Sequence, residues 1–327
     1  MATSCAHLTA HATRTWALVA GIVTTVTLVL GIGNAPPAEA APGSAVANDA
    51  YGWPVKPFRR QHPIRGAFAD PRIGGRSHSF HFGVDVSCPD GTPVYATLTG
   101  RAFISARHRE TVSVIADHGS VEFGYWHIEP TIRSGQHVTA YRTVIGRVIA
   151  PWGHVHFAER RNGVYVNPLR PGAMGPYADT TVPTVRAVTV GPFANRSRKE
   201  PAHGRVDLVA EAYDTTPISI SGPWHGKPLT PALLRWRLLD GKRAVTGWRT
   251  AVDFRLTYPS NDLWSRTYVG WTRQNKKIWD GRYGFYLAHG FDTRTLRDGS
   301  YLVQTTATDV RGNTGTGLFP LTVANDA

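Results

Sequence analysis

Hydrophobic and polar residues alternate in short runs through most of this chain. Between residues 92 and 168 the runs read "TPVYATLTG", "RAFISAR", "TVSVIAD", "EFGYWHI", "TVIGRVIA", "HVHFAER" and "GVYVNP". Gly, Asp, Asn and Pro separate them, and a period of two is typical of half-buried β-strands. "ADHGSVEF" predicts a tight connection with Asp117 to Ser120 at its tip. The pattern therefore predicts an all-β unit, and no long amphipathic helix is expected.

The second half of the chain repeats this pattern with different residues. Its runs are "VRAVTVGPF", "GRVDLVAEAYD", "LLRWRLLDG", "FRLTYP", "TYVGW" and "SYLVQTTATDVRGNTGTGLFPLTV". The last run predicts a hairpin around "DVRGNTG". Short strands with such turns favour an immunoglobulin-like β-sandwich. The segment "DGSYLVQTTATDVRGNTG" also resembles bacterial immunoglobulin-like repeat domains.

The N-terminal segment has the pattern of an export signal. Arg14 precedes the apolar run "WALVAGIVTTVTLVLGIG", and "AEA" follows at 38–40. We expect a signal peptide over 1–40 and a secreted chain, extracellular or associated with the cell wall, with no membrane attachment after cleavage. An uncleaved single-span anchor is the alternative, because the apolar run is long. The linker "APGSAVANDA" at 41–50 and the Thr- and Pro-rich "PYADTTVPTV" then predict domains over 51–176 and 177–327.

Composition and charge narrow the class of protein. With 327 residues, of which 42% are hydrophobic, the chain fits two globular domains and excludes a disordered or multi-pass membrane protein. The net charge of +13 on an exported, monomeric protein favours anionic cell-wall polymers as partners over nucleic acid. General solubility is the other explanation of this charge. Cys88 is the one cysteine after the expected signal peptide, and we expect it to be a small buried hydrophobic residue.

Two histidines in "GHVHFAER" carry the first chemical signal. On a strand, His154 and His156 point to the same face, which suggests a metal site, a proton relay or a chance pair. Upstream, His81 and Asp85 are four residues apart, so they also share a face of a strand, and Gly83 between them leaves room for a close approach. Two histidines with one carboxylate are a ligand set of catalytic zinc sites, which leave a fourth position to water.

Other polar and aromatic residues have less specific interpretations. His127 follows Tyr125 by two residues, so we expect both on one face of a strand. Surface or turn positions are expected for four other histidines: His78, His108, His118 and His137. The second half holds six tryptophans that suit a sandwich core better than a glycan-binding face: Trp224, Trp236, Trp248, Trp264, Trp271 and Trp279. "AEAYD" and "TDVRGN" contain acidic residues able to bind Ca²⁺, but their spacing is not diagnostic.

Four segments together resemble a known enzyme family. "HFGVDV…GTPVYA", "DHG…YWHI", "SGQHVTAYRTVIG" and "GHVHF", in this order, are similar to the lysostaphin-type (LytM-like) zinc metalloendopeptidases, over about residues 51–171. That family cuts peptide bonds in bacterial peptidoglycan with a β-rich domain that has an open groove. The resemblance implies one Zn²⁺ per chain, held by His81, Asp85 and His156. It implies that His127 and His154 are catalytic residues that do not bind the metal.

The sequence departs from the family pattern in two places. The family usually has Glu two residues after the last His of His–x–His, where this chain has Ala158; Glu159 is one step further and is expected on the other face. The loop before the histidine pair, "VIGRVIAPWGHVH", is short. We expect a secreted endopeptidase acting on peptidoglycan cross-bridges or stem peptides, which its second domain positions on the wall. The alternatives are a catalytically weak or inactive wall-binding or amidase-activating module of the same fold, and a general secreted protease.

Overall fold

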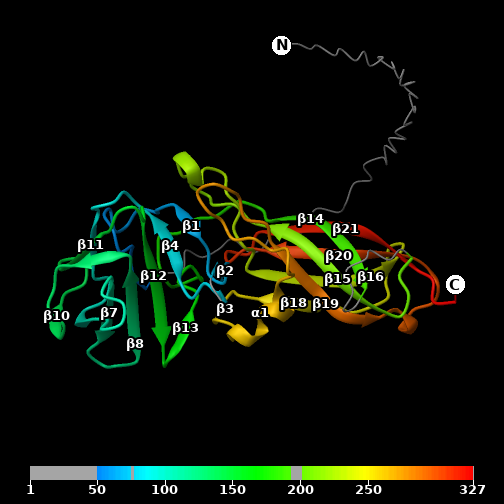
Figure 1. Ribbon diagram of the computed structural model, residues 1–327, viewed down its shortest axis with the longest axis horizontal. Coiled ribbons are helices and arrows are strands. Elements are labelled where there is room, and N and C mark those ends of the chain that lie inside the picture. Colours follow the sequence, from blue (N-terminus) through cyan, green and yellow to red (C-terminus); the bar gives the residue numbers. More distant parts are fainter. Residues whose placement is uncertain (1–49, 75–76, 193–200, 327) are drawn as a thin grey trace, which may run out of the picture. The chain divides into compact units, whose positions relative to one another are not determined.

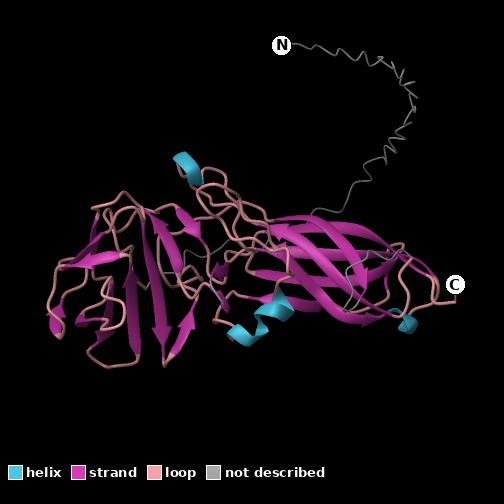
Figure 2. Ribbon diagram, viewed as in Figure 1, coloured by secondary structure: helices cyan, strands magenta, loops and turns pink. Residues whose placement is uncertain are grey.

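The structure is a computed structural model that describes residues 50–74, 77–192 and 201–326. The expected signal peptide and residues 41–49 of the expected linker lie outside the described residues. Strands dominate throughout (Figures 1 and 2), and every pair of named strands in the described ranges is antiparallel. Within these ranges, no helix is both long and apolar enough to cross a membrane. The predicted all-β fold is therefore confirmed.

The first half is built on one large sheet and two small ones. The eight-stranded sheet runs in the order β1-β4-β12-β8-β7-β6-β10, with β13 paired to β12. Its strands are β1 (Ile64–Gly66), β4 (Val84–Ser87), β6 (Gly100–Ile104), β7 (Thr111–Ala116), β8 (Val121–Trp126), β10 (Gln136–Val138), β12 (His154–Arg161) and β13 (Val164–Val166). The small sheets hold β5 (Pro93–Tyr95), β11 (Val144–Val148) and β9 (Ile128–Pro130), and β2 (Pro71–Gly74) with β3 (Ser77–Phe80).

The second half contains two further antiparallel sheets. One has the order β14-β15-β19, with β14 (Thr184–Pro192), β15 (Arg205–Tyr213) and β19 (Gly284–Asp292). The other has the order β17-β16-β20-β21, with β18 paired to β16: β16 (Leu233–Asp240), β17 (Arg243–Ala244), β18 (Arg249–Asp253), β20 (Gly299–Thr308) and β21 (Thr314–Val323). The helical turns are short: η1 (Gly222–Trp224), η2 (Asn261–Leu263), α1 (Trp264–Thr267) and η3 (Thr293–Thr295). Residues from both sheets, Trp236 and Leu208 among them, share one buried cluster.

Most of the predicted runs are strands, and two are not. The tip at Asp117 to Ser120 joins β7 to β8, and the "DVRGNTG" hairpin joins β20 to β21. "FRLTYP" is not a strand, because Phe254 and Tyr258 leave the sheet to pack against the first half. "TYVGW" follows α1 and makes one bridge, Tyr268 to Phe285. Packing between the halves overrides the β propensity of both runs.

The two halves share a buried core. The Phe80 ring lies 5.7 Å from the rings of both Phe254 and Tyr268. The Tyr268 hydroxyl donates to the Ala69 carbonyl at 2.8 Å, and the Thr230 amide donates to the buried Asp70 carboxylate at 2.9 Å. One continuous apolar cluster therefore includes residues of both halves.

Candidate functional site

The register of two neighbouring strands brings the candidate metal ligands together. On β12, His156 lies opposite Asp85 of β4, and His154 lies opposite Ser87. Side chains of opposed residues point to the same face of a sheet. The Oδ1 atom of Asp85 is 3.2 Å from Nδ1 of His156 and 3.4 Å from Nε2 of His154. The prediction that the two histidines project into one space is confirmed.

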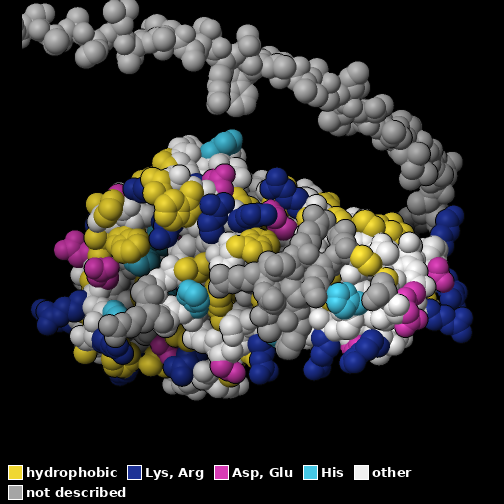
Figure 3. All heavy atoms as spheres, turned by 45° about the vertical axis from the view of Figure 1, so that its right-hand side comes forward, with side chains coloured by type: hydrophobic (Ala, Val, Ile, Leu, Met, Phe, Trp, Pro, Cys, Tyr) yellow, Lys and Arg dark blue, Asp and Glu magenta, His cyan; other side chains and the backbone are white. Residues whose placement is uncertain are grey.

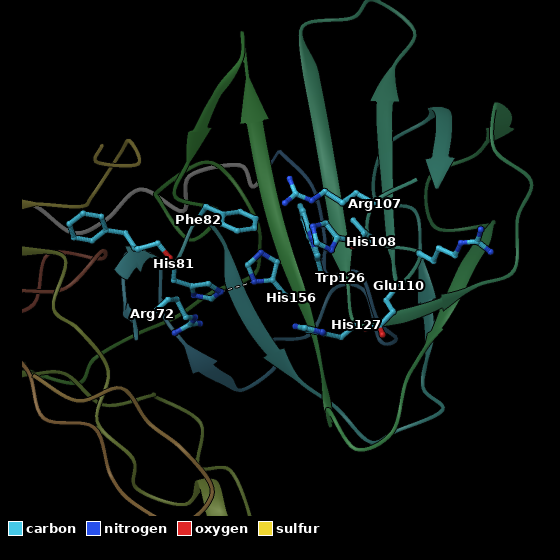
Figure 4. A pocket seen from close by; sticks show the side chains of 13 residues that line it. Arg72, His81, Phe82, Arg107, His108, Glu110, Trp126, His127 and His156 are labelled. Atoms are coloured by element: carbon cyan, nitrogen blue, oxygen red, sulfur yellow. Dashed lines mark hydrogen bonds between the residues drawn. The ribbon is translucent and has the colours of Figure 1, made fainter. Parts of the chain in front are cut away.

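His81 reaches the same point from a loop. β3 ends at Phe80 and β4 begins at Val84, so His81 and Asp85 do not lie on one strand as expected. Even so, Nε2 of His81 is 3.1 Å from Oδ1 of Asp85 and 2.6 Å from Nδ1 of His156 (Figure 4, dashed line). The other ring nitrogen of His81, Nδ1, donates to the Ala67 carbonyl at 2.8 Å, which leaves the lone pair on Nε2.

These three donors have the spacing of a metal site. Their ligand atoms, Nε2 of His81, Oδ1 of Asp85 and Nδ1 of His156, lie within 4.8 Å of one another. Tetrahedral zinc with bonds of about 2.0–2.2 Å separates its ligand atoms by about 3.3 Å. A histidine ligand whose second ring nitrogen donates to a backbone carbonyl, as His81 does, is the usual arrangement. The donor set therefore fits zinc.

Two glycines leave the space that the candidate ligands occupy. A Cβ atom at Gly83 would lie 2.8 Å from Nε2 of His156 and 2.3 Å from the Phe157 carbonyl oxygen. A Cβ atom at Gly66 would lie 2.3 Å from Oδ2 of Asp85. Any larger residue would displace a ligand, so the expected close approach at Gly83 is the approach of β12 itself.

The electrostatics favour a charged carboxylate beside neutral imidazoles. Burial alone would raise the pKa of Asp85, but His81, His154 and Arg72, whose Nη2 donates to Oδ2 at 2.8 Å, hold it well below its usual range. Burial lowers the pKa of His81, and it lowers the pKa of His156 to about 3. Metals bind the deprotonated forms of these side chains, so this protonation pattern suits metal binding.

The backbone turns His127 toward the site. β8 ends at Trp126, and His127 has a φ of 64°. Its ring stacks on Trp152 at 3.9 Å and lies 4.7 Å from the His154 ring. Tyr125 points instead into the core, where its hydroxyl contacts Thr97. The prediction that Tyr125 and His127 share one face is wrong, because the positive φ breaks the alternation of the strand.

Two cavities adjoin at these residues. One of about 710 Å³ is also lined by Phe82, Trp126 and the β6–β7 loop (Figure 4). The other, of about 690 Å³, is also lined by Asp85, His154 and residues of the second half. Both are lined by Arg72, His81, His127 and His156. The candidate ligands thus have open space on more than one side.

The position after the histidine pair has a structural role. Ala158 is buried, and Glu159 lies on the face opposite His156, where its carboxylate accepts from Arg170 at 2.6 Å and 2.8 Å and from the Tyr51 hydroxyl. These donors hold the pKa of Glu159 below its usual value, although burial would raise it. Glu159 therefore does not replace the missing carboxylate beside His156.

The remaining sequence expectations have mixed outcomes. Cys88 packs against the apolar core, and burial raises its thiol pKa to about 11. The four other histidines are exposed as expected: His78, His108, His118 and His137. Only two of the six tryptophans are buried, Trp236 and Trp264; Trp248, Trp271 and Trp279 are exposed. The preference for a core role is thus wrong for those three.

The acidic segments of the second half also meet. Carboxylate oxygens of Asp179, Asp214 and Asp309 lie within 4.8 Å of one another. Tyr177 donates to Asp179 and Asn313 to Asp309, while burial raises the pKa of Asp214 to about 8. A protonated Asp214 relieves the repulsion within the group.

Sequence reasoning missed several residues at the site. Arg65 lies with Nη2 2.6 Å from Nδ1 of His154, and Arg72 contacts Asp85. Trp224 and Gln274 to Lys277 line the cavity from the second half. The basic run "RQNKK" was the one available signal for the latter; the two arginines stand in no recognisable pattern.

The comparisons with known proteins concern mainly the first half. Residues 79–168 match the model of Peptidase family M23, and this segment contains all five candidate site residues. The catalytic domain of lysostaphin from Staphylococcus simulans is similar at 21% identity, over 33% of this chain and 90% of that chain, with a TM-score of 0.29. Full lysostaphin from the same organism is similar at 14% identity, over 83% and 92%, with a TM-score of 0.30.

A zinc-containing peptidase from Vibrio cholerae is similar at 21% identity, over 37% of this chain and 39% of that chain, with a TM-score of 0.30. No curated protein matches the chain.

Proposed function

Starting from the peptidase family M23 domain at residues 79–168, we propose that this chain is a zinc endopeptidase that hydrolyses peptide bonds in peptidoglycan cross-bridges or stem peptides. His81, Asp85 and His156 would hold one Zn²⁺, and His127 and His154 would act on the substrate. The observation that carries the proposal is the convergence of three ligand atoms, from two buried histidines and a partly buried aspartate, where two open cavities adjoin.

The residues of the chain divide the chemical work. When bound, zinc lowers the pKa of its water to about 7 and polarises a carbonyl group. Burial and the neighbouring His154 lower the pKa of His127 to about 3, so its ring is neutral at neutral pH. An imidazole in that position also stabilises the oxyanion of a tetrahedral intermediate. Trp152 stacks on the His127 ring and fixes its orientation.

The tautomer of His154 depends on two neighbouring groups. Arg65 only donates, so its contact of 2.6 Å requires a bare Nδ1 on His154, whereas the contact of 2.9 Å to the Trp152 carbonyl requires a proton there. The two contacts are therefore alternatives. The first leaves the proton on Nε2, which faces Asp85. In that state the Nε2–H group of His154 donates a hydrogen bond into the site.

The proposal extends to location and organisation. It places a cleaved signal peptide at 1–40, a peptidase domain at 51–176 and an immunoglobulin-like sandwich at 177–327 on an exported monomer. The net charge of +13 supports retention on an anionic bacterial cell wall. Lys and Arg side chains occur in several places on the face in Figure 3. The second half would contribute to this retention.

One experiment tests the activity. Zinc content is measured on the purified chain, and the products released from purified sacculi are identified by mass spectrometry. We expect about one zinc per chain, cleavage of peptide bonds, loss of activity after chelation and recovery with added zinc. Zinc-loaded protein that binds sacculi without releasing peptides would support the inactive module instead. Equal cleavage by metal-free protein would contradict the zinc mechanism.

A further inference from the structure

The second half of the chain forms one wall of the cavity at the candidate site. The cavity of about 690 Å³ is lined on this side by Trp224 and by Gln274, Asn275, Lys276 and Lys277. The latter belong to a small hairpin, residues 273–282, which is closed by bridges between Arg273 and Arg282 and between Lys276 and Trp279. We call the hairpin and Trp224 the cationic wall.

Hydrogen bonds fix the wall against both halves. Oε1 of Gln274 accepts from the Ile73 amide of β2 at 2.5 Å. Nζ of the buried Lys227 donates to the Trp279 carbonyl at 2.9 Å and to Asp280 at 2.8 Å. Asn275 donates to the Pro228 carbonyl. Since β2 pairs with β3, which ends directly before His81, the hairpin has a fixed position relative to the candidate ligands.

Two lysines of the cationic wall, together with Arg65 of β1, present cations to this cavity. The Arg65 guanidinium lies 4.2 Å from the centre of the Trp224 ring. Lys276 and Lys277 are exposed, and Nζ of Lys276 lies 5.2 Å from the Trp279 ring. Among the described residues, neither lysine nor Arg65 forms an ion pair, whereas Arg72 is paired with Asp85. An anionic ligand in this cavity would therefore meet three available positive charges.

We propose that the cationic wall binds a carboxylate of the substrate, so that the enzyme selects peptides carrying a free carboxylate near the scissile bond. This rests on the proposed peptidase function, because the same cavity contains Asp85, His154 and His156. Trp224 orients Arg65, and Lys276 and Lys277 supply further positive charge. The second half is thus a part of the substrate site.

Paired substrates test this selection. One is a cross-linked stem-peptide dimer with free carboxylates on its glutamate and diaminopimelate residues, and the other is the same dimer with those groups as carboxamides. We expect the full-length, zinc-loaded chain to prefer the carboxylate form by roughly fivefold to tenfold in kcat/KM. The double variant Lys276→Gln/Lys277→Gln should bring this ratio close to one, and Lys276→Arg/Lys277→Arg should restore it.

The control removes two charges elsewhere. Lys242→Gln/Arg243→Gln changes exposed cations of the β16–β17 hairpin, which does not line the cavity, and should keep the wild-type ratio. Equal kcat/KM for the two dimers in the wild type, or an unchanged ratio in Lys276→Gln/Lys277→Gln, would overturn the proposal.

A separate measurement distinguishes failure of the peptidase function. If neither dimer is cleaved, the proposed activity is wrong, and calorimetry with the same two dimers then tests the wall alone. Tighter binding of the carboxylate form, lost in Lys276→Gln/Lys277→Gln, would support carboxylate binding by the cationic wall. Equal binding of both forms refutes it.

Discussion

Replacing Phe80 by alanine tests whether the two halves of the chain share one core. The Phe80 side chain is 1% exposed and contacts the rings of Phe254, Tyr258 and Tyr268, all from the second half. Truncating a buried phenylalanine costs about 3–5 kcal/mol, which includes the cavity that remains. The upper part of that range applies here, because three aromatic contacts are lost together.

The assay is equilibrium unfolding in guanidinium chloride, followed by tryptophan fluorescence and by circular dichroism. We expect a single transition by both probes in the wild type, because residues of both halves occupy one cluster. Phe80→Ala should lower the free energy of unfolding by about 4 kcal/mol. The matched control is Phe103→Ala, since Phe103 is 39% exposed; it should cost less than about 1 kcal/mol.

Two results would refute the reasoning. A loss below about 1 kcal/mol for Phe80→Ala would mean that the contact between the halves contributes little to stability. Two separate transitions in the wild type, with Phe80→Ala affecting neither midpoint, would mean that the halves unfold independently.

Three further predictions concern charged and metal-binding groups. His156→Ala should lose stoichiometric zinc, whereas His154→Ala should keep it and lower kcat by about 10²–10⁴; metal analysis with turnover measurements decides, and reversed zinc contents would show that the two roles are exchanged. Glu159→Gln should cost about 3–5 kcal/mol at neutral pH, because it leaves Arg170 without its buried partner. The folded-state pKa of Glu159 is lowered, so its contribution to the free energy of unfolding is complete above pH 4.5 and is lost as the pH falls through the folded-state pKa. A Glu159→Gln variant as stable as the wild type in urea at neutral pH would contradict this. Asp214 has its pKa raised from 3.8 to about 8, so it should make the wild type less stable as the pH rises between these values. Asp214→Asn should make the melting temperature depend less on pH over this range. Equal pH dependence of the melting temperature in the variant and the wild type would contradict the prediction.

The sequence predicted the strands and the candidate ligands because both depend on local alternation. Strand periodicity located β7, β8 and β12, and the spacing of His154 and His156 placed both rings on one face. The convergence of His81 with Asp85 was correct although its reason was not, because a loop rather than a strand carries His81. The register between β4 and β12 then places His156 opposite Asp85 and so brings the three candidate ligands together.

What the sequence could not predict depends on backbone exceptions and on distant contacts. The positive φ of His127 separates it from Tyr125, and no residue type marks that turn. The cationic wall lies near the candidate ligands through contacts between the halves, such as that of Gln274 with Ile73, 201 residues earlier in the chain. Such contacts follow from tertiary packing and leave no periodic pattern.

The long-range hydrogen bonds between the halves also affect the kinetics of folding. Tyr268 bonds to Ala69 across 199 residues. Closing a flexible loop of that length costs about 5 kcal/mol of chain entropy before the contact returns any energy. Chains dominated by such non-local pairings fold slowly, in milliseconds to seconds. We therefore expect the cationic wall to reach the candidate ligands late, after the local β12–β13 hairpin has paired.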